Sequence, residues 1–273
     1  MKAITDTMEV SRSNQYEKMA QPGRRLFYKK AADDHYLKLI REITDERPTY
    51  GYRRVAAILN RGLRQKGETP VNHKRVYRIM KIHNLLLQRY TGRPVRVHDG
   101  TVMTIRSNMR WCSDAFEIAC WNGERLRVAF SMDCCDREIL SYVATTGGIC
   151  GDMVRDLMAE SIEKRFGFVD QLPGPIEWLS DNGPAYAAHE TRNFGRLMGF
   201  RICTTPYYSP ESNGMAESFV KTFKRDYVQM HPLNDARSTM EQLPKWFEDY
   251  NENHPHKSLK MRSPKEFRKQ QLS

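Results

Sequence analysis

The sequence contains no apolar run approaching the roughly 18 residues that a membrane-spanning helix requires. Its N-terminal stretch, MKAITDTMEVSRSNQ, is polar and does not contain the apolar core of a signal peptide. The six cysteines include no CxxC pair, which disfavours both a disulfide framework and a zinc site. We therefore expect a cytoplasmic protein with buried free thiols and no zinc.

Acidic charge is scarce in the first part of the chain. Residues 1–105 contain 22 Lys+Arg against 10 Asp+Glu, whereas the remaining 168 residues contain 22 against 23. The net charge of +11 therefore originates in the N-terminal part. A basic module beside a near-neutral body is typical of proteins that bind polyanions, so this distribution favours a nucleic acid partner over a basic surface without one.

Three short helices are predicted in the basic part. Residues 33–46 have helical periodicity. In RPTYGYRRVAAILNRGL and in GETPVNHKRVYRIMKIHNLL, helix-breaking residues come before a segment with the same periodicity. Asn72 is the expected N-cap of the third helix. Such a triplet with a basic third helix is typical of a helix-turn-helix, although plain helical bundles share it. Unpaired cations on this module would suit DNA phosphates, and the candidates are Arg53, Arg54, Lys74, Arg75 and Arg78.

The body of the chain predicts a mixed sheet. Strands are expected at 110–120, 124–135, 138–146, 175–181 and 200–206, with a two-residue hairpin turn at Asn122-Gly123. Helices are expected at 151–167, 189–199, 211–229 and 238–252. A meander followed by alternating helices and strands indicates an α/β sheet with helices on both faces, an order similar to that of the ribonuclease-H-like fold. The expected organisation is a polar, basic segment (1–32), a helix-turn-helix domain (33–87), a basic linker (88–109) and a catalytic domain with C-terminal helices (110–273).

Three carboxylates stand out by their positions. Asp114 lies in the first strand of the body, Asp181 ends the fourth, and Glu217 begins a long helix. If the first strand is central and the fourth lies parallel beside it, the two aspartates can meet and the helix can bring Glu217 onto them. Converged carboxylates repel one another unless hard cations neutralise them, and two Mg²⁺ ions in such a site support phosphodiester chemistry.

Each of these acids also has a purely structural interpretation. Asp181 could belong to an Asp-Asn-Gly turn, Asp114 could be a satisfied acid at the core edge, and Glu217 could favour the helix N-terminus. Rival acids lie in the same regions, namely Glu117, Asp133, Asp136 and Glu211.

The phase of the long helix gives an independent observation. At about 100° per residue, Glu217, Lys221 and Lys224 share one polar face. The opposite face is apolar and contains Phe219, Val220, Phe223, Tyr227 and Met230. The lysines could form an ordinary i,i+4 pair with Glu217, worth about 0.2–0.5 kcal/mol, or could hold DNA phosphates beside the site.

Four motifs carry a family resemblance: RWCSDAFE, WLSDNGPAY, SPESNGMAESFVKTFKRDY and FEDYNENHPHKSLKMRSPKEF. Together they resemble the OrfB part of bacterial insertion-sequence transposases, which have a retroviral-integrase-like DDE catalytic core. YGYRRVAAIL and VNHKRVYRIM resemble the helix-turn-helix that precedes this core. The resemblance covers about residues 33–268.

The resemblance implies roles for particular residues. Asp114, Asp181 and Glu217 match the catalytic, metal-binding triad of the family, with two Mg²⁺ ions or Mn²⁺ as a substitute. Lys221 and Lys224 match basic residues that contact element-end DNA. His254 and His256 fall in the C-terminal signature, where we expect structural or DNA-contacting roles rather than metal ligation.

The implied function is DNA transposition and integration through metal-dependent cleavage and strand transfer at insertion-sequence ends. Expected partners are double-stranded DNA, at least a second copy of the chain on DNA, and an upstream-frame OrfA product, because VSRSNQYEK resembles the tail of such a unit. Two alternatives remain open: a ribonuclease-H-like nuclease without strand transfer, and a DNA-binding repressor with an inactive core.

Overall fold

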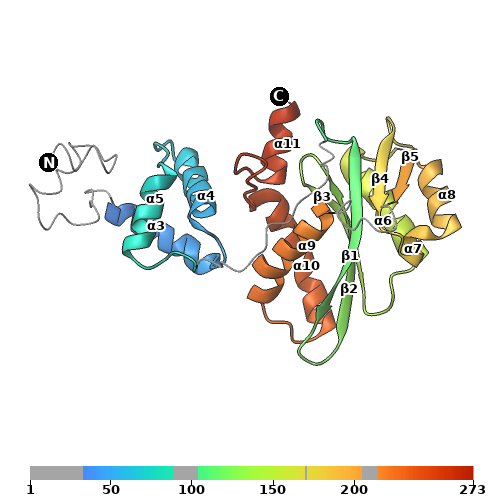
Figure 1. The fold of residues 1–273 in the computed structure, drawn as a ribbon, viewed down its shortest axis with the longest axis horizontal. Helices are drawn as coiled ribbons and strands as arrows, with labels where there is room; N and C mark the ends of the chain where they lie inside the picture. Colours follow the sequence, from blue (N-terminus) through green and yellow to red (C-terminus); the bar gives the residue numbers. More distant parts are fainter. Residues whose placement is uncertain (1–32, 89–103, 170, 205–213, 273) are drawn as a thin grey trace, which may run out of the picture.

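The computed structural model describes residues 33–88, 104–169, 171–204 and 214–272. A helical module precedes a five-stranded sheet that is covered by helices (Figure 1). The module consists of α3 (Asp33–Glu46), α4 (Tyr52–Gln65) and α5 (His73–Ile82). The strands are β1 (Arg110–Ala119), β2 (Arg125–Asp133), β3 (Ile139–Thr145), β4 (Ile176–Ser180) and β5 (Phe200–Thr204). The remaining helices are α6 (Gly151–Phe166), α7 (Pro184–Ala187), α8 (His189–Leu197), α9 (Gly214–Asp226), the 3-10 turn η2 (Val228–Met230), α10 (Ala236–Asn253) and α11 (Pro264–Leu272).

The three predicted helices of the basic part are confirmed. Their apolar faces meet in a core that includes Ile40, Leu59 and Val76, all at most 3% exposed. Asn72 caps α5 as predicted, since its side chain accepts a hydrogen bond of 2.8 Å from the backbone N–H of Lys74. The predicted segment 1–32 and most of the linker 88–109 lie outside the described residues.

The sheet has the predicted topology. Its order is β3-β2-β1-β4-β5, with β1 antiparallel to β2 and parallel to β4, so β1 is central. Alternate side chains point to opposite faces. Cys112 and Phe116 of β1 pack with α9 and α10, whereas Trp111 packs with α6. Figure 1 shows α9 and α10 on one side of the sheet and α6 on the other.

Two local predictions are wrong. The β1–β2 hairpin has a three-residue loop, Trp121–Gly123, because the N–H of Cys120 donates to the carbonyl of Glu124 at 2.8 Å across it. Gly123 takes the positive φ of 89° that such a loop requires, while Asn122 does not. Met230 is 42% exposed rather than on the buried face, since α9 ends at Asp226 and the tighter turn η2 changes the helical phase. Phe219, Phe223 and Tyr227 are buried as predicted.

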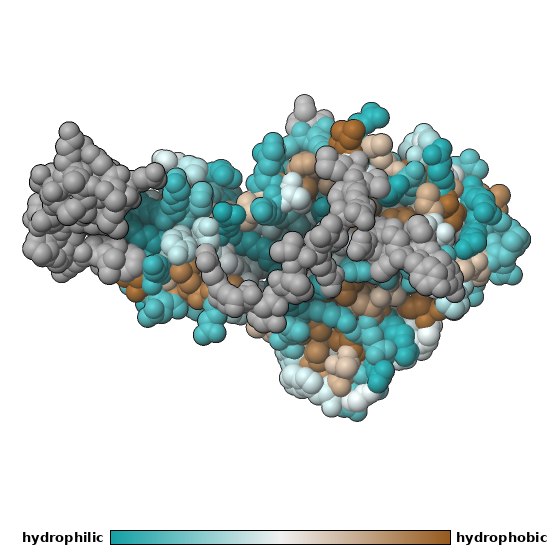
Figure 2. Space-filling model, viewed as in Figure 1, coloured by the Kyte–Doolittle hydropathy of each residue, from teal (hydrophilic) through white to brown (hydrophobic). Residues whose placement is uncertain are grey.

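The cysteines are free thiols, but they are not all buried. Cys112, Cys120 and Cys134 are buried, Cys135 and Cys203 are partly buried, and Cys150 is exposed at the start of α6. None of the described helices is long and apolar enough to cross a membrane. Much of the visible surface is hydrophilic, with more hydrophobic patches toward the β1–β2 end of the sheet domain (Figure 2).

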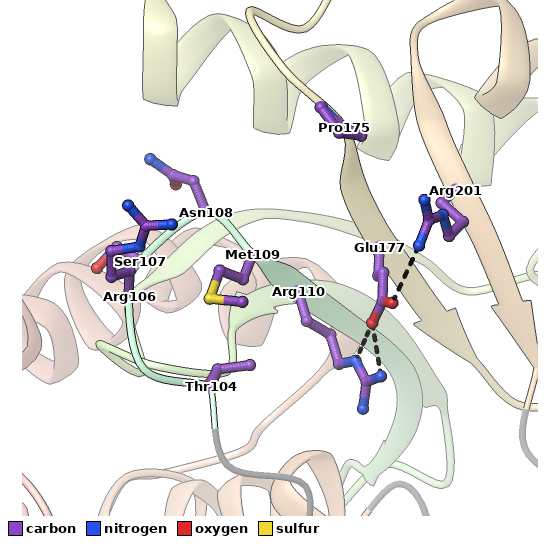
Figure 3. Close-up of a pocket in the computed structure, with 9 residues that line it drawn as sticks. All are labelled: Thr104, Arg106, Ser107, Asn108, Met109, Arg110, Pro175, Glu177 and Arg201. Atoms are coloured by element: carbon purple, nitrogen blue, oxygen red, sulfur yellow. Dashed lines mark hydrogen bonds and ion pairs between the residues drawn. The ribbon is translucent and has the colours of Figure 1, made fainter.

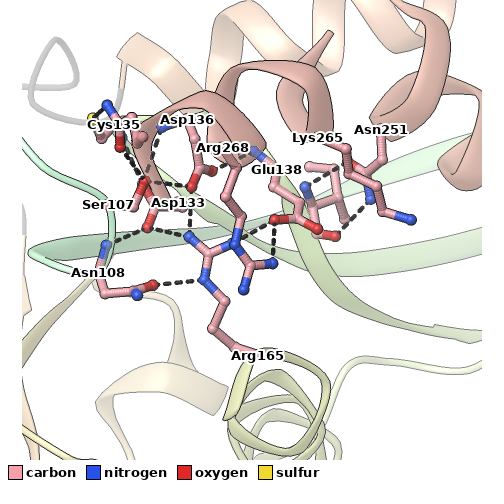
Figure 4. A network of polar contacts seen from close by, with 12 residues as sticks. Ser107, Asn108, Asp133, Cys135, Asp136, Glu138, Arg165, Asn251, Lys265 and Arg268 are labelled. Atoms are coloured by element: carbon pink, nitrogen blue, oxygen red, sulfur yellow. Dashed lines mark hydrogen bonds and ion pairs between the residues drawn. The ribbon is translucent and has the colours of Figure 1, made fainter. Parts of the chain in front are cut away.

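A buried ionic network joins the turn after β2 to α6 (Figure 4). Arg165 of α6 donates to Asp133 at 3.1 Å, to Asp136 at 2.5 Å and also to Glu138. Arg268 of α11 adds a second cation to Glu138 at 3.0 Å. Burial, and then the charge of Asp136, raises the pKa of Asp133 to about 6. The cluster is tolerated because Arg165 places its guanidinium between the three acids.

The helical module docks on the helices of the sheet domain. Arg47 makes two hydrogen bonds to Asp249 of α10, at 2.6 and 2.8 Å. Tyr50 Oη lies 2.9 Å from Nδ1 of His254. Arg54 pairs at 3.1 Å with Asp226, the last residue of α9, whose side chain is 1% exposed. The module is therefore tied to the C-terminal end of the helix that begins near Glu217.

We expect Arg165→Met to destabilise the fold by about 3–5 kcal/mol, because it leaves three buried carboxylates without their shared cation. Lys164→Met is the matched control on the same helix. Its side chain is 53% exposed, with an ion pair to Glu160 and a 3.2 Å hydrogen bond to Oγ of Ser141, so its loss should cost under about 1 kcal/mol. Urea unfolding of both variants measures the difference, and equal losses would contradict a structural role for the network.

A double-mutant cycle on Arg47→Ala and Asp249→Ala should give a coupling free energy of about 1–3 kcal/mol, because the two bonds are charge-assisted and partly buried. The exposed pair Arg237 and Glu241 serves as the control cycle and should give less than about 0.5 kcal/mol. A coupling at Arg47 and Asp249 no larger than in the control would show that the module does not dock this way in solution.

Candidate active site

The strand register aligns two of the three predicted acids. In the parallel ladder, Cys112 of β1 pairs with Leu179 of β4. Continuing this register by two residues places Asp114 beside Asp181, which directly follows β4. Residues in register on parallel neighbours point to the same face, and Cys112 and Leu179 both contribute to the core under α9. The two aspartates therefore belong to the sheet face that α9 covers.

Helix α9 is held on that face by aromatic side chains. The rings of Phe219 and Phe130 lie 4.5 Å apart, and those of Phe223 and Phe116 lie 5.7 Å apart. Phe130 is the cross-strand partner of Asp114. Glu217, two residues before Phe219 in the first turn of α9, thus lies on the part of the helix that passes over β1.

The electrostatics of Asp114 indicate that the three acids are neighbours. Its pKa is raised to about 6 by burial first and then by the charges of Asp181 and Glu217, while a 2.8 Å bond from the N–H of Ala115 acts in the opposite direction. Because Coulomb repulsion falls with distance, both other carboxylates lie close enough to act on it. Such mutual repulsion is typical of acid clusters that a cation would neutralise.

Asp181 and Glu217 are held differently from Asp114. Asp181 is exposed, and its Oδ1 accepts a 3.0 Å bond from the N–H of Gly183, where an added Cβ would lie 3.0 Å from the same oxygen. Oε2 of Glu217 lies 3.6 Å from Nζ of Lys221. Within the described residues, no three Asp, Glu, His or Cys side chains already stand close enough together to hold one metal ion. The oxygen donors nevertheless match the preference of Mg²⁺, and their repulsion is what a cation would relieve.

A buried hydroxyl pair supports the site from the opposite sheet face. Tyr186 of α7 lies 2.9 Å from Oγ of Ser113, the residue before Asp114. Burial raises the pKa of the Tyr186 hydroxyl, and the charges of Asp114 and Asp181 act in the same direction. This contact ties the turn after Asp181 to β1. Sequence reasoning missed Tyr186, although the Gly-Pro-Ala-Tyr run after Asp181-Asn182 predicts a short helix start at that point.

The two lysines of α9 lie on the polar side of the helix. Lys221 is 64% exposed in its side chain and forms the i,i+4 pair with Glu217 that the phase allows. Nζ of Lys224 lies 5.8 Å from the ring of Phe116. DNA contact by either lysine stays a prediction.

The premise that the module presents unpaired cations is wrong for three of its arginines. Arg75 and Arg78 bond the buried Asp33 at 2.8 and 2.6 Å, and Arg54 bonds Asp226. Arg53 donates to the hydroxyl of Tyr52 at 3.1 Å, and Lys74 is exposed. The buried carboxylate of Asp33 requires the positive charges of Arg75 and Arg78. The composition of the chain does not show which cations are used in this way. Their contact with DNA also stays a prediction.

The rival acids have other partners. Asp133 and Asp136 belong to the buried Arg165 network, and Glu117 pairs with Arg125 and Arg127. Glu211 lies outside the described residues.

The two C-terminal histidines occupy interior positions. Burial, and then the charge of His256, lowers the pKa of His254 far below its usual range. Burial and nearby arginines lower that of His256 to about 3. Both rings are therefore neutral at physiological pH, and His254 forms part of the contact between the module and the sheet domain.

A cavity of about 640 Å³ lies at the opposite end of β1 and β4 (Figure 3). There Glu177 bonds Arg110 at 2.6 Å and lies 3.9 Å from Arg201. None of the three predicted catalytic acids lines this cavity.

Comparison with protein families finds three matching regions. An HTH-like domain matches residues 31–93, and two integrase core domain models match residues 105–210 and 198–264.

Individual relatives agree with these matches. The chain is 50% identical over 241 residues to the Escherichia coli transposase InsD for insertion element IS2A/D/F/H/I/K, covering 87% of this chain and 79% of that protein. The K12 transposase InsD for insertion element IS2-9 is also 50% identical, with 78% of its length covered. Among solved structures, a chain of the simian T-cell lymphotropic virus intasome aligns with a TM-score of 0.50 and 17% identity, covering 77% of this chain and 70% of that one. The last likeness concerns the fold alone.

We expect Asp114→Asn to stabilise the metal-free protein. An acid whose folded pKa rises from 3.8 to about 6 makes the native state bind more protons than the unfolded state, so stability falls as pH rises from about 4 to 6. At pH 7.5 the substitution should raise the unfolding free energy by about 1–2 kcal/mol, and below pH 4 the gain should vanish. Urea unfolding in a chelating buffer measures both values.

Asp156→Asn, at an exposed position on α6, controls for the loss of one negative charge. Parallel stability profiles for wild type and Asp114→Asn across this pH range would contradict the repulsion among the three acids.

Proposed function

The chain belongs to the family of insertion-element transposases, and on that premise we propose that it cuts and joins DNA at element ends with Asp114, Asp181 and Glu217 as catalytic carboxylates. One observation carries this assignment. The β1–β4 register and the aromatic contacts of α9 support the convergence of the three acids, as does the pKa of Asp114, which is raised by burial first and then by the charges of Asp181 and Glu217.

The three carboxylates would hold divalent cations, with Mg²⁺ as the expected ion, Mn²⁺ as a substitute and two ions as the expected number. When bound, such ions supply charge stabilisation for the attacking and leaving oxygens of an in-line displacement. Oxygen donors from a strand, a strand end and a helix suit a hard cation.

The residues of the chain would divide the remaining work. Asp114 is fixed within β1 and by the N–H of Ala115, while Asp181 is oriented by the N–H of Gly183. Glu217 would reach from α9, where its 3.6 Å ion pair with Lys221 would be released. Lys221 and Lys224 would hold phosphates next to the reacting one.

The reaction would have two steps of the same kind. Water displaces one ester oxygen at an element end and frees a 3′-hydroxyl. That hydroxyl then displaces an ester oxygen of a second phosphodiester, so one P–O bond forms as another breaks. Each step is a single displacement between DNA and water or DNA and DNA, so no covalent bond to the enzyme is required.

DNA is the partner that the family and the HTH-like domain imply. Pairing two element ends would require at least two copies of the chain. We further propose that an OrfA product contributes to end recognition and that the protein works on DNA in the cytoplasm.

The deciding experiment is a Mg²⁺-dependent assay on labelled duplexes matching the element ends. Wild type should yield both nicked and joined strands. Glu217→Gln should reduce both by about 100-fold or more while DNA binding persists, because ion binding contributes several kcal/mol to such reactions. Glu241→Gln on the exposed surface of α10 is the matched control and should keep full activity.

The outcomes separate the alternatives. Nicking without joined product would support a nuclease without strand transfer. DNA binding by the wild type with neither product would support a repressor. Joined product from Glu217→Gln at the wild-type rate would contradict the assignment of Glu217.

A further inference from the structure

A second cavity, of about 510 Å³, lies where the helical module meets α9. Arg54 comes from α4, Arg137 from the turn between β2 and β3, and Lys257 from the segment after α10. Three hydroxyl side chains join them, Ser218, Thr222 and Ser258. Among the described residues that line this cavity, none is acidic. Its polar wall is therefore cationic and rich in hydrogen-bond donors.

Two of these cations have no ion-pair partner among the residues that the structure describes. Across the described residues, neither Arg137 nor Lys257 forms an ion pair, whereas Arg54 is paired with Asp226. Nε of Arg137 and Nε2 of His256, a neighbouring lining residue, are buried without a hydrogen-bond partner. A buried donor without a partner is costly, so Nε of Arg137 favours an acceptor ligand, and Nε2 of His256 can donate to the same ligand in one tautomer.

The position of Arg137 is fixed by the residues on both sides of it. Asp136 and Glu138 belong to the buried Arg165 network, and Arg137 itself has a φ of 65° in the tight turn between them. The guanidinium is therefore attached to a rigid part of the backbone. It acts on its surroundings, since together with burial and Arg54 it lowers the pKa of His256.

The cavity shares α9 with the proposed catalytic site. At about 100° per residue, Ser218 and Thr222 lie about 100–140° around the helix from Glu217. The floor is apolar and includes Met215, Phe219 and Tyr250. Glu217 therefore lies on one side of α9, and the cationic cavity lies on the adjacent side of the same helix. The apolar floor lowers the local dielectric constant, which strengthens the attraction between a bound anion and the cations of the cavity.

We propose that this cavity binds a backbone phosphate of DNA at a distance from the scissile bond and so positions the strand against both the helical module and α9. The proposal rests on the proposed function, which makes DNA the substrate. Arginine, lysine and hydroxyl groups are the usual phosphate ligands, and such contacts fix the register of a protein on DNA without reading its sequence. Because Arg54 and Arg137 come from different parts of the fold, the complete cavity exists only while the module is docked.

The salt dependence of DNA binding tests this directly. The slope of log K against log salt is negative, and each phosphate that is no longer neutralised makes it shallower by about 0.9. With a duplex oligonucleotide and no divalent metal, the double variant Arg137→Gln/Lys257→Gln removes both cations from the one proposed phosphate contact and should make the slope shallower by about 0.9. Lys245→Gln, an exposed lysine on α10, is the control and should leave it unchanged. A wild-type slope in a folded double variant would overturn the proposal.

A second variant covers the case in which Arg137→Gln unfolds the turn. Lys257 is exposed, so Lys257→Gln alone should fold normally and make the slope shallower by up to about 0.9. An unchanged slope for Lys257→Gln would show that Lys257 does not contact a DNA phosphate and would contradict the proposed site.

Free phosphate is the other source of the same chemistry. If inorganic phosphate at constant ionic strength raises the melting temperature of wild type but not of Lys257→Gln, while the DNA slopes are equal, the cavity is a small-anion site and the DNA proposal is wrong. If wild type binds DNA with the predicted slopes but never joins ends, the transposition chemistry fails while the phosphate contact stands.

Discussion

The packing of α9 against β1 and β2 is the constraint on which the rest of the site depends. Phe219 and Phe223, one helical turn apart, insert between the aromatic side chains of the sheet and fix the rotation of the helix. If α9 packed with its aromatic side chains shifted by one residue, Glu217 would turn by about 100° around the helix and separate from the aspartates. The same seat decides which residues of α9 form the polar face with Lys221 and which face the cationic cavity.

Among the described residues, the acids around Arg165 and the proposed catalytic acids differ in how their charge is compensated. Asp133, Asp136 and Glu138 are buried around Arg165, with Arg268 as a second cation, so their charge is balanced inside the protein. Within the part of the chain that the structure describes, the ion pair between Lys221 and Glu217 is the one internal cation contact of Asp114, Asp181 and Glu217. An uncompensated cluster needs an external cation, whereas a compensated one holds elements together, and this distinction separates the proposed catalytic acids from their rivals.

The basic charge of the N-terminal module is also divided between two uses. Arg47 and Arg54 anchor the module to α10 and α9, and Arg75 and Arg78 neutralise the buried Asp33. Part of the cationic excess therefore serves folding and docking rather than presenting free charge. Since Arg54 binds the last residue of α9, the position of the module and the placement of the Glu217 helix are mechanically linked. DNA held by one would be held in register with the other.

The sequence by itself determined the order of elements, the three-helix module, the central position of β1 and the polar face of α9, because each follows from local periodicity, turn residues and strand order. It also singled out Asp114, Asp181 and Glu217. Only the tertiary structure decided which acids are compensated, that Tyr186 supports the site, that His254 lies in an interface, and that Arg54, Arg137 and Lys257 share a cavity. These features depend on contacts between residues tens to hundreds of positions apart, and local sequence patterns do not specify which distant partner a charge or hydroxyl will meet.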